Sequence, residues 1–173
     1  MIKSDGSNWS LDWDARELNR ICKQLNIRVF DSRYEKLTKN QSVYYTSRYN
    51  VLMDWQTPTH KIAFPYFHGR PSSGDGFIRM INTIKSHHNE IGRIQVSHSE
   101  MHDIILETGI DPNKVLRIPI GINLDYFNWT TPELRHEERA NLGIPQSAVV
   151  IGSFQKDGNG WGEGLKPKLI KGP

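Results

Sequence analysis

Residues 93–121 read "RIQVSHSEMHDIILETGIDPNKVLRIPIG". Within this stretch, residues 93–97 form a short β-branched apolar run that predicts a buried strand, and residues 100–108 carry apolar side chains at helical spacing. Gly109 predicts a left-handed end to that helix, and residues 114–120 predict another strand. A strand, a helix and a strand joined by short links are typical of a parallel sheet.

The chain before residue 93 continues this alternation. Apolar residues at helical spacing predict helices over residues 8–25 and 77–90. Further apolar runs predict strands at residues 27–30, 42–47 and 61–67. Pro65 marks the end of its strand or a sheet edge, because proline cannot donate a ladder hydrogen bond. We therefore expect an α/β, Rossmann-like fold with helices on both faces of a parallel sheet.

The two ends of the chain give separate expectations. Residues 1–3 are too few for a proper strand, so we expect the sheet to lack its first strand. After Gly121 a polar helix follows, with Thr130 or Thr131 as its cap, Pro132 in its first turn and Gly143 at its end. Residues 148–154 then predict a new buried strand. We expect a first domain with a linker helix over residues 1–147 and the start of a second Rossmann-like domain over residues 148–173.

Length and composition limit the function classes. The chain has 173 residues, of which 36% are hydrophobic and 24% charged, as in a globular protein with one full domain. No apolar run approaches a membrane span or a secretory signal, so we expect a cytoplasmic protein. Cys22 is the only cysteine and lies on the apolar face of the first helix, where a core thiol is expected. The net charge of +3 is dispersed, which favours neither nucleic acid nor a clear membrane patch.

The loop after residues 61–67 is the first candidate site. In an open α/β sheet such loops lie at the carboxyl edge of the strands, where ligands bind, so His68 and Arg70 are expected to face a cleft. The spacing from Gly69 to Gly74 begins like a phosphate loop, but Asp75 and Gly76 stand where Lys and Ser or Thr belong. A flexible strand-to-helix loop is the better interpretation of these glycines.

Metal and nucleophile patterns are weaker. His98 and His102 lie four residues apart, but Glu100 is one position too late for a zinc-protease pattern, so no metal site is predicted. No nucleophile elbow is present. Gly6 and Ser7 precede the first helix, where the backbone can approach an anionic ligand, although a plain helix cap is the simpler interpretation.

The segment of residues 93–127 resembles the middle of the family-four retaining glycosyltransferases, which have the two-domain GT-B fold. Their pattern is a strand ending in Ser, a helix ending in Gly, a strand ending in IP-x-G, and a Phe. The matching residues are Ser97, Gly109, Pro119, Gly121 and Phe127. The resemblance extends more weakly to His68 and Gly69 and to the segment after residue 148, with Asn123 where the family often has Asp.

This resemblance implies transfer of a sugar from a nucleotide-sugar donor to an acceptor with retained configuration. It implies that Gly6, Ser7, Lys156 and Lys171 lie near the donor diphosphate, that His68 lines the reaction centre, and that Arg70 and Gly121 line the cleft. The implied acceptor is a glycan, a lipid-linked molecule or a small molecule, and peripheral membrane contact is compatible with it. No metal or other cofactor is implied.

Two expectations follow about the chain as a whole. The acidic E-x7-E motif of the family would lie beyond Pro173, so we expect a fragment that transfers no sugar by itself. The rival hypothesis is a non-catalytic Rossmann-like module that binds a nucleotide or a protein.

Overall fold

The computed structural model describes residues 1–4, 6, 10–29, 42–54 and 61–152. The chain divides into two compact units, residues 1–124 and residues 125–173. The division falls close to Gly121, where the sequence changes in character, and earlier than residue 148. Each unit is described by itself below.

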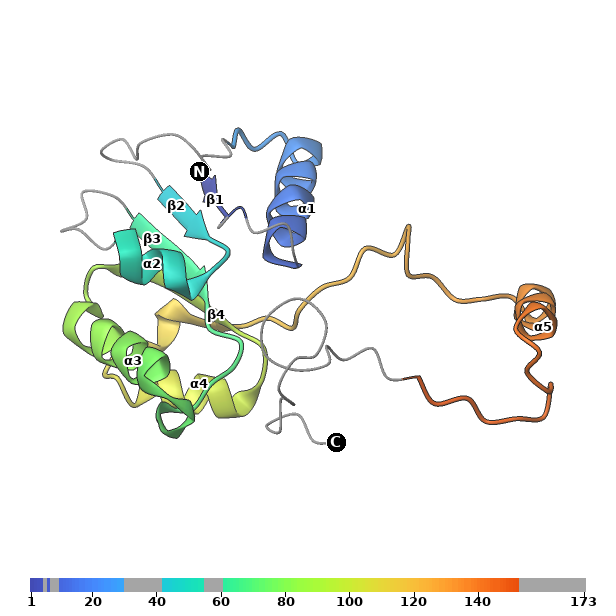
Figure 1. Cartoon of the computed structure of the whole chain (residues 1–173). Coiled ribbons are helices and arrows are strands. Elements are labelled where there is room, and N and C mark those ends of the chain that lie inside the picture. Colours follow the sequence, from blue (N-terminus) through green and yellow to red (C-terminus); the bar gives the residue numbers. More distant parts are fainter. Residues whose placement is uncertain (5, 7–9, 30–41, 55–60, 153–173) are drawn as a thin grey trace. The chain divides into compact units, whose positions relative to one another are not determined.

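The first unit is built on a sheet of five strands in the order β1-β2-β3-β4-β5, and all neighbours are parallel (Figure 1). The strands are β1 (Ile2–Lys3), β2 (Ser42–Tyr45), β3 (Lys61–Pro65), β4 (Ile91–Val96) and β5 (Val115–Arg117). The helices are α1 (Ser10–Gln24), α2 (Arg48–Asp54), α3 (Asp75–His87) and α4 (Ser99–Leu106), with short 3₁₀ turns η1 (Pro71–Ser73) and η2 (Pro112–Lys114). The predicted Rossmann-like α/β fold is confirmed.

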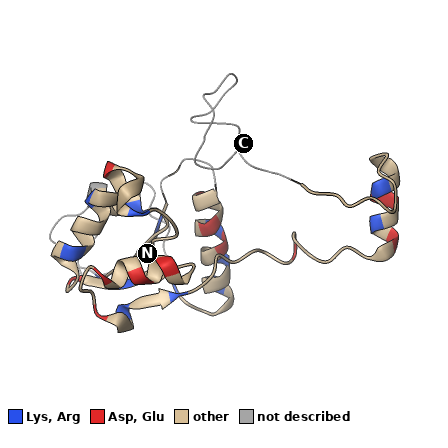
Figure 2. Cartoon of the chain, turned by 90° about the horizontal axis from the view of Figure 1, so that it is seen from below, with Lys and Arg blue, Asp and Glu red and all other residues tan. Residues whose placement is uncertain are grey.

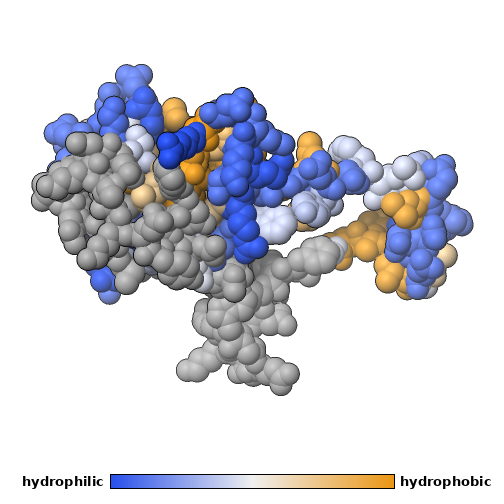
Figure 3. Space-filling view, turned by 90° about the horizontal axis from the view of Figure 1, so that it is seen from above, coloured by the Kyte–Doolittle hydropathy of each residue, from blue (hydrophilic) through white to orange (hydrophobic). Residues whose placement is uncertain are grey.

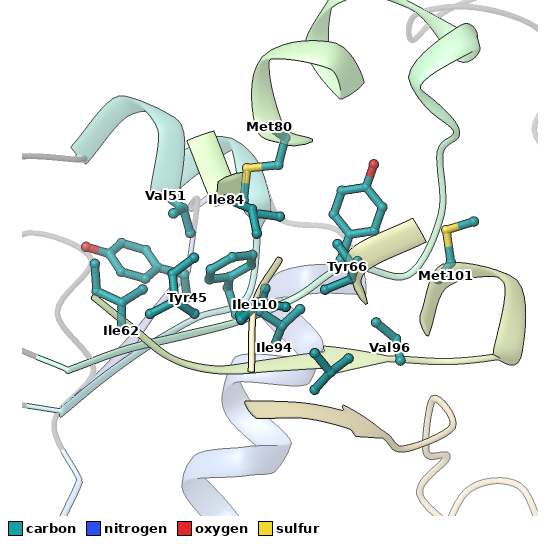
Figure 4. Packing of buried hydrophobic residues seen from close by; sticks show 14 of the residues in the cluster. Tyr45, Val51, Ile62, Tyr66, Met80, Ile84, Ile94, Val96, Met101 and Ile110 are labelled. Carbon is teal, nitrogen blue, oxygen red and sulfur yellow. The ribbon is translucent and has the colours of Figure 1, made fainter. Parts of the chain in front are cut away.

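The main core lies on one face of this sheet (Figure 4). Successive strand side chains point to opposite faces, so Tyr45, Ile62, Ile94 and Val96 reach the same side. The helices cover this side with their buried residues, namely Val51 of α2, Met80 and Ile84 of α3, and Met101 and Ile105 of α4. Removal of these side chains from water is the main stabilising contribution to the unit.

Helix α1 packs on the other face of the sheet (Figure 1). Its residues Trp13 and Leu18 line a cavity together with Tyr44 and Gln95, which alternate with the core residues along β2 and β4. The connection after β1 therefore leaves toward one face, and the connection after β2 leaves toward the opposite face. Helices on both faces are confirmed.

The start of the chain corrects two expectations. Ile2 and Lys3 do form a strand, β1, which pairs with Tyr44 and Tyr45, so the sheet does not lack a first strand before α1. Residues 27–29 are not a strand, and Ile27 is 52% exposed. The reason is the end of α1, where Asn26 has a φ of 57° and the Ile27 amide donates to the Cys22 carbonyl, closing the helix with a left-handed turn. Phe30 lies outside the described residues.

The elements from β2 to β5 follow the prediction closely, with shifted ends. Pro65 is the last residue of β3, the central strand, so it marks an end and not a sheet edge. Gly109, with a φ of 85°, ends the turn after α4 as expected. Helix α2 was not predicted, and β5 is shorter than residues 114–120. Cys22 is a free thiol of intermediate burial, so it is less enclosed than predicted.

The second unit contains α5 (Pro132–Asn141). The Thr131 hydroxyl accepts a hydrogen bond from the Leu134 amide at 3.2 Å, which selects Thr131 and not Thr130 as the cap, and Gly143 ends the helix with a φ of 66°. Residues 148–152 are not in a strand, and Val149 and Ile151 are 89% and 91% exposed. The predicted strand is therefore wrong over these residues, because no strand of the described part pairs with them. Hydrophobic surface, in orange, lies among the hydrophilic surface of the second unit (Figure 3).

Candidate functional site

The carboxyl edge of the sheet is the part of the first unit most suited to a ligand. The loops after β1 and β2 diverge, because α1 and α2 lie on opposite faces. In open α/β sheets, ligands bind outside the carboxyl ends of the strands where neighbouring connections diverge in this way. The residues at the ends of β1, β2 and β3 are therefore the first to consider.

Buried polar residues gather at this edge. Of the seven buried polar or charged residues in the described part, five are Ser4, Asp12, Thr46, Ser47 and Arg48, which follow β1 and β2 or begin the adjoining helices. The Thr46 amide donates to the Lys3 carbonyl at 2.9 Å, and the Gly6 amide donates to Asp12 Oδ1 at 3.2 Å. The Ser4 hydroxyl has no hydrogen-bond partner in the described structure. Such a concentration of polar groups is characteristic of ligand sites and is costly in a core.

Gly6 lies at this edge, after β1. Its φ of 69° is a left-handed conformation that glycine adopts readily, and its amide is already directed at Asp12. Ser7, the other residue predicted there, lies outside the described residues.

The loop that carries His68 is held by three side chains from different elements. The carbonyl of Phe67 accepts from Ser97 Oγ at 3.2 Å, that of His68 accepts from Arg48 Nη1 at 3.3 Å, and that of Gly69 accepts from Tyr66 Oη at 2.7 Å. Three successive carbonyls are thus fixed, so the backbone beneath His68 is set by the ends of β2, β3 and β4.

Arg48, the first residue of α2, is a buried cation that contacts this loop, and it was not predicted from the sequence. It is 7% exposed, its Nε has no hydrogen-bond partner, and no carboxylate of the described residues pairs with it. Its guanidinium carbon lies 4.3 Å from the ring centroid of Phe77 and 4.8 Å from that of Tyr49. Aromatic faces stabilise a cation in this way. Arg48 directly follows the strand predicted over residues 42–47, so the rule that selected His68 could also have found it.

Phe77 completes the support of His68. The two rings meet edge to face, with centroids 6.0 Å apart and planes at 69°. A Cβ on Gly69 would lie 1.7 Å from the Phe77 ring, and the φ of Gly69 is 109°. Gly69 is thus required both by its backbone conformation and by the close approach of Phe77.

Arg70 has a different environment from His68. Its Nε forms a salt bridge with the Glu100 carboxylate of α4, and this bond and charge raise the pKa of the Arg70 guanidinium above its ordinary value. Both side chains are exposed, so the pair contributes little to stability. Arg70 lines a shallow recess with Glu100 and Asp103, apart from Gly121.

A cavity of about 200 Å³ lies between α1 and the sheet, and we call it the α1 pocket. Its apolar wall is made by Trp13, Leu18, Ile21, Tyr44, Phe67 and Ile120. Its polar groups come from Asp14, Glu17 and Arg20 on α1, and from Gln95 and Asn123. Thr46 and Phe67 connect the pocket to the carboxyl edge, and Gly121 lines it. The predicted cleft residues Gly121 and Arg70 are therefore not brought together.

The remaining predicted residues are the basic ones. Lys156 and Lys171 lie outside the described residues. Where the structure describes the chain, Lys and Arg are dispersed among Asp and Glu and form no basic stripe (Figure 2). No helix in that part of the chain is long and apolar enough to cross a membrane.

Comparison with known proteins assigns the chain to no family. No family model matches the chain, and no curated protein is significantly similar to it.

Proposed function

We propose that this chain carries the acceptor-side domain of a retaining glycosyltransferase that uses a nucleotide-sugar donor. The observation that carries the proposal is the position of the motif of residues 93–121. Ser97 follows β4 and holds the Phe67 carbonyl next to His68, while Gly109 ends the turn after α4. Pro119 and Gly121 follow β5 at the same edge of the sheet. Ser97, Pro119 and Gly121 thus lie at the carboxyl edge, whereas Gly109 lies where the chain returns to the start of β5.

The proposed chemistry needs positive charge at the leaving group. When the bond between sugar and diphosphate breaks, negative charge grows on the diphosphate, and cations or amides already directed there lower the barrier. Lys156 and Lys171, with the backbone at Gly6 and Ser7, are the groups proposed for this role. The leaving phosphate takes the acceptor proton as the acceptor attacks from the same face, which retains the configuration without a carboxylate nucleophile.

His68 is the proposed residue of the reaction centre. Its backbone is fixed by Arg48, Tyr66 and Ser97, so its position relative to the cleft is preorganised. The proposed acceptor is a glycan, a lipid-linked molecule or a small molecule, in the cytoplasm or at the membrane surface. No metal or other cofactor takes part in the proposed reaction, and nucleic acid is not a proposed partner.

Calorimetric binding of nucleotide sugars to the purified chain tests the donor assignment. UDP-, GDP- and ADP-linked sugars are compared with the corresponding nucleoside monophosphates, which lack the diphosphate. We expect one diphosphate class to bind and its affinity to fall about tenfold or more when Lys156 and Lys171 are both replaced by Ala, because charge-assisted bonds are lost. Lys61→Ala is the control, since Lys61 begins β3 at the opposite edge of the sheet.

Two results would count against the proposal. Binding by none of the nucleotide sugars would remove the donor assignment. Equal binding of a nucleotide sugar and its monophosphate, unaffected by the lysine substitutions, would favour the rival hypothesis of a non-catalytic nucleotide-binding module.

A further inference from the structure

The α1 pocket contains a carboxylate, that of Asp14, to which no described residue donates a hydrogen bond. This carboxylate is half-buried and lines the pocket. Burial raises the pKa of Asp14 above its ordinary value, which means that its surroundings do little to stabilise the charge. Because the carboxylate stays partly exposed in the pocket, a ligand that carries hydrogen-bond donors can replace the water around it.

The other polar groups of the pocket already have partners. Glu17 accepts from Arg20 Nε at 2.9 Å and from Asn123 Nδ2 at 3.0 Å. Gln95 accepts from Tyr44 Oη at 3.0 Å and donates to the Ile118 carbonyl at 3.2 Å. These bonds fix the walls. Both bonds to Glu17 go to its Oε2 atom, so the Asp14 carboxylate and Glu17 Oε1 are the carboxylate oxygens available to a ligand.

The walls favour a flat or ring-shaped ligand with an apolar face. Trp13 is 42% exposed and precedes Asp14 in α1. Tyr44 of β2 and Phe67 of the loop after β3 also line the pocket. Aromatic side chains offer large apolar contact with few rotatable bonds. Two carboxylates and one guanidinium are the charged groups that line the pocket, so its net charge disfavours an anion.

We propose that the α1 pocket binds an uncharged sugar ring, whose hydroxyls donate to Asp14 and whose C–H face packs on Trp13. A sugar combines hydroxyl donors with an apolar ring face. The Asp14 carboxylate is complementary to the hydroxyls, and the aromatic ring of Trp13 is complementary to the apolar face. An entirely apolar ligand would leave the Asp14 carboxylate desolvated and unpaired. The assignment of this sugar as the acceptor rests on the proposed function, but the binding itself does not.

NMR titration of the purified chain tests this proposal. Glucose, galactose, mannose and N-acetylglucosamine are added separately, and the indole N–H of Trp13 and the amides of Asp14 and Tyr44 are followed. We expect saturable shifts with at least one of these sugars, with a Kd on the order of mM for a single ring. Asp14→Asn should weaken binding about tenfold, because a hydrogen bond to a charged group is replaced by one to an amide. Trp13→Ala should also weaken it.

The controls use the same chain. Asp103→Asn neutralises an exposed carboxylate on α4, on the other face of the sheet, and should leave the affinity unchanged. Glucose 6-phosphate should bind more weakly than glucose because of the charge of the pocket. Binding of glucosamine alone, through its ammonium group, would overturn the assignment to an uncharged ring, as would shifts outside the α1 pocket or equal affinity in Asp14→Asn.

This test is separate from that of the proposed function. Sugar binding without nucleotide-sugar binding would leave the pocket assigned and remove the transferase. Nucleotide-sugar binding without sugar binding in the α1 pocket would remove this inference alone.

Discussion

At the scale of residues, the backbone around His68 is fixed by neighbouring residues that tolerate few substitutions. Gly69 shows this most clearly. A side chain there meets both a φ of 109° and the ring of Phe77, whereas Gly74 has a φ of 138° but no atom within 4 Å of an added Cβ. Substitution of Gly74 therefore tests backbone strain alone, and substitution of Gly69 tests backbone strain together with steric overlap.

We expect Gly69→Ala to lower the free energy of unfolding by about 3 kcal/mol or more, and Gly74→Ala by about 1–2 kcal/mol. The difference is the cost of moving Phe77 away from His68 and Arg48. Urea denaturation followed by circular dichroism measures both. Equal losses in the two variants would show that the contact with Phe77 is not restrictive.

Arg48 allows a test that separates loop rigidity from stability. Arg48→Met removes the bond to the His68 carbonyl, but it also removes a buried charge that no carboxylate of the described residues pairs with, so its effect on global stability is expected to be small. The backbone at His68 and Gly69 should nevertheless become more mobile, with lower NMR order parameters. Arg79→Met on the exposed side of α3 is the matched control. Unchanged order parameters at His68 would contradict the role of Arg48.

Asp14 gives a pH-dependent prediction. Its pKa is raised in the folded state, so the protonated form is favoured by folding, and its contribution to stability is lost as the pH rises through the folded pKa. Asp14→Asn should therefore melt at a higher temperature than the unsubstituted chain at pH 7. The difference should close at about pH 3, below the ordinary pKa of aspartate of about 3.9. A lower Tm for Asp14→Asn at pH 7 would show that the carboxylate has a stabilising partner.

At the scale of elements, the sequence predicted most of the helices correctly but predicted two strands that the described residues do not form. Helices α1, α3 and α4 were predicted because their apolar residues recur at helical spacing. Helix α5 was predicted from its capping residue, Pro132 and the Gly143 at its end. Residues 27–29 and 148–152 are rich in Val and Ile, but a strand forms only when another strand supplies its hydrogen bonds. A single-sequence pattern contains no information on that partner. The short α2 was missed because its cap, Ser47, whose hydroxyl accepts from the Tyr49 amide at 3.3 Å, was assigned to the preceding strand.

Helix α5 depends strongly on its cap, because it is a polar helix of ten residues. Thr131→Ala should destabilise it by about 1 kcal/mol, since the Leu134 amide loses its acceptor. Thr130→Ala should have little effect. The Cα chemical shifts of residues 132–141 report the helix population in each variant, and equal shifts in the two would contradict the assignment of the cap.

At the scale of the whole molecule, the sequence predicts the layers of the first unit better than it predicts the site. The loop position of His68 follows from where a predicted strand ends, whereas Gly6 was singled out only from its place before the first helix. The structure places both at the carboxyl edge. The burial of Arg48 beside His68 and the position of Asp14 in the α1 pocket depend on which face each helix covers, so only the folded chain shows them. The functional roles of these residues remain proposals.

The most direct test of the central claim, that the carboxyl edge binds the substrates of sugar transfer, is a ¹H–¹⁵N NMR titration of the chain with the nucleotide sugar selected by calorimetry. We predict that the largest shifts occur at Gly6, Thr46, His68 and Gly69, at the ends of β1, β2 and β3. The amides of Ser42, Lys61 and Ile91, which begin their strands at the opposite edge, should not shift. Shifts confined to that opposite edge, or to neither edge, would contradict the claim.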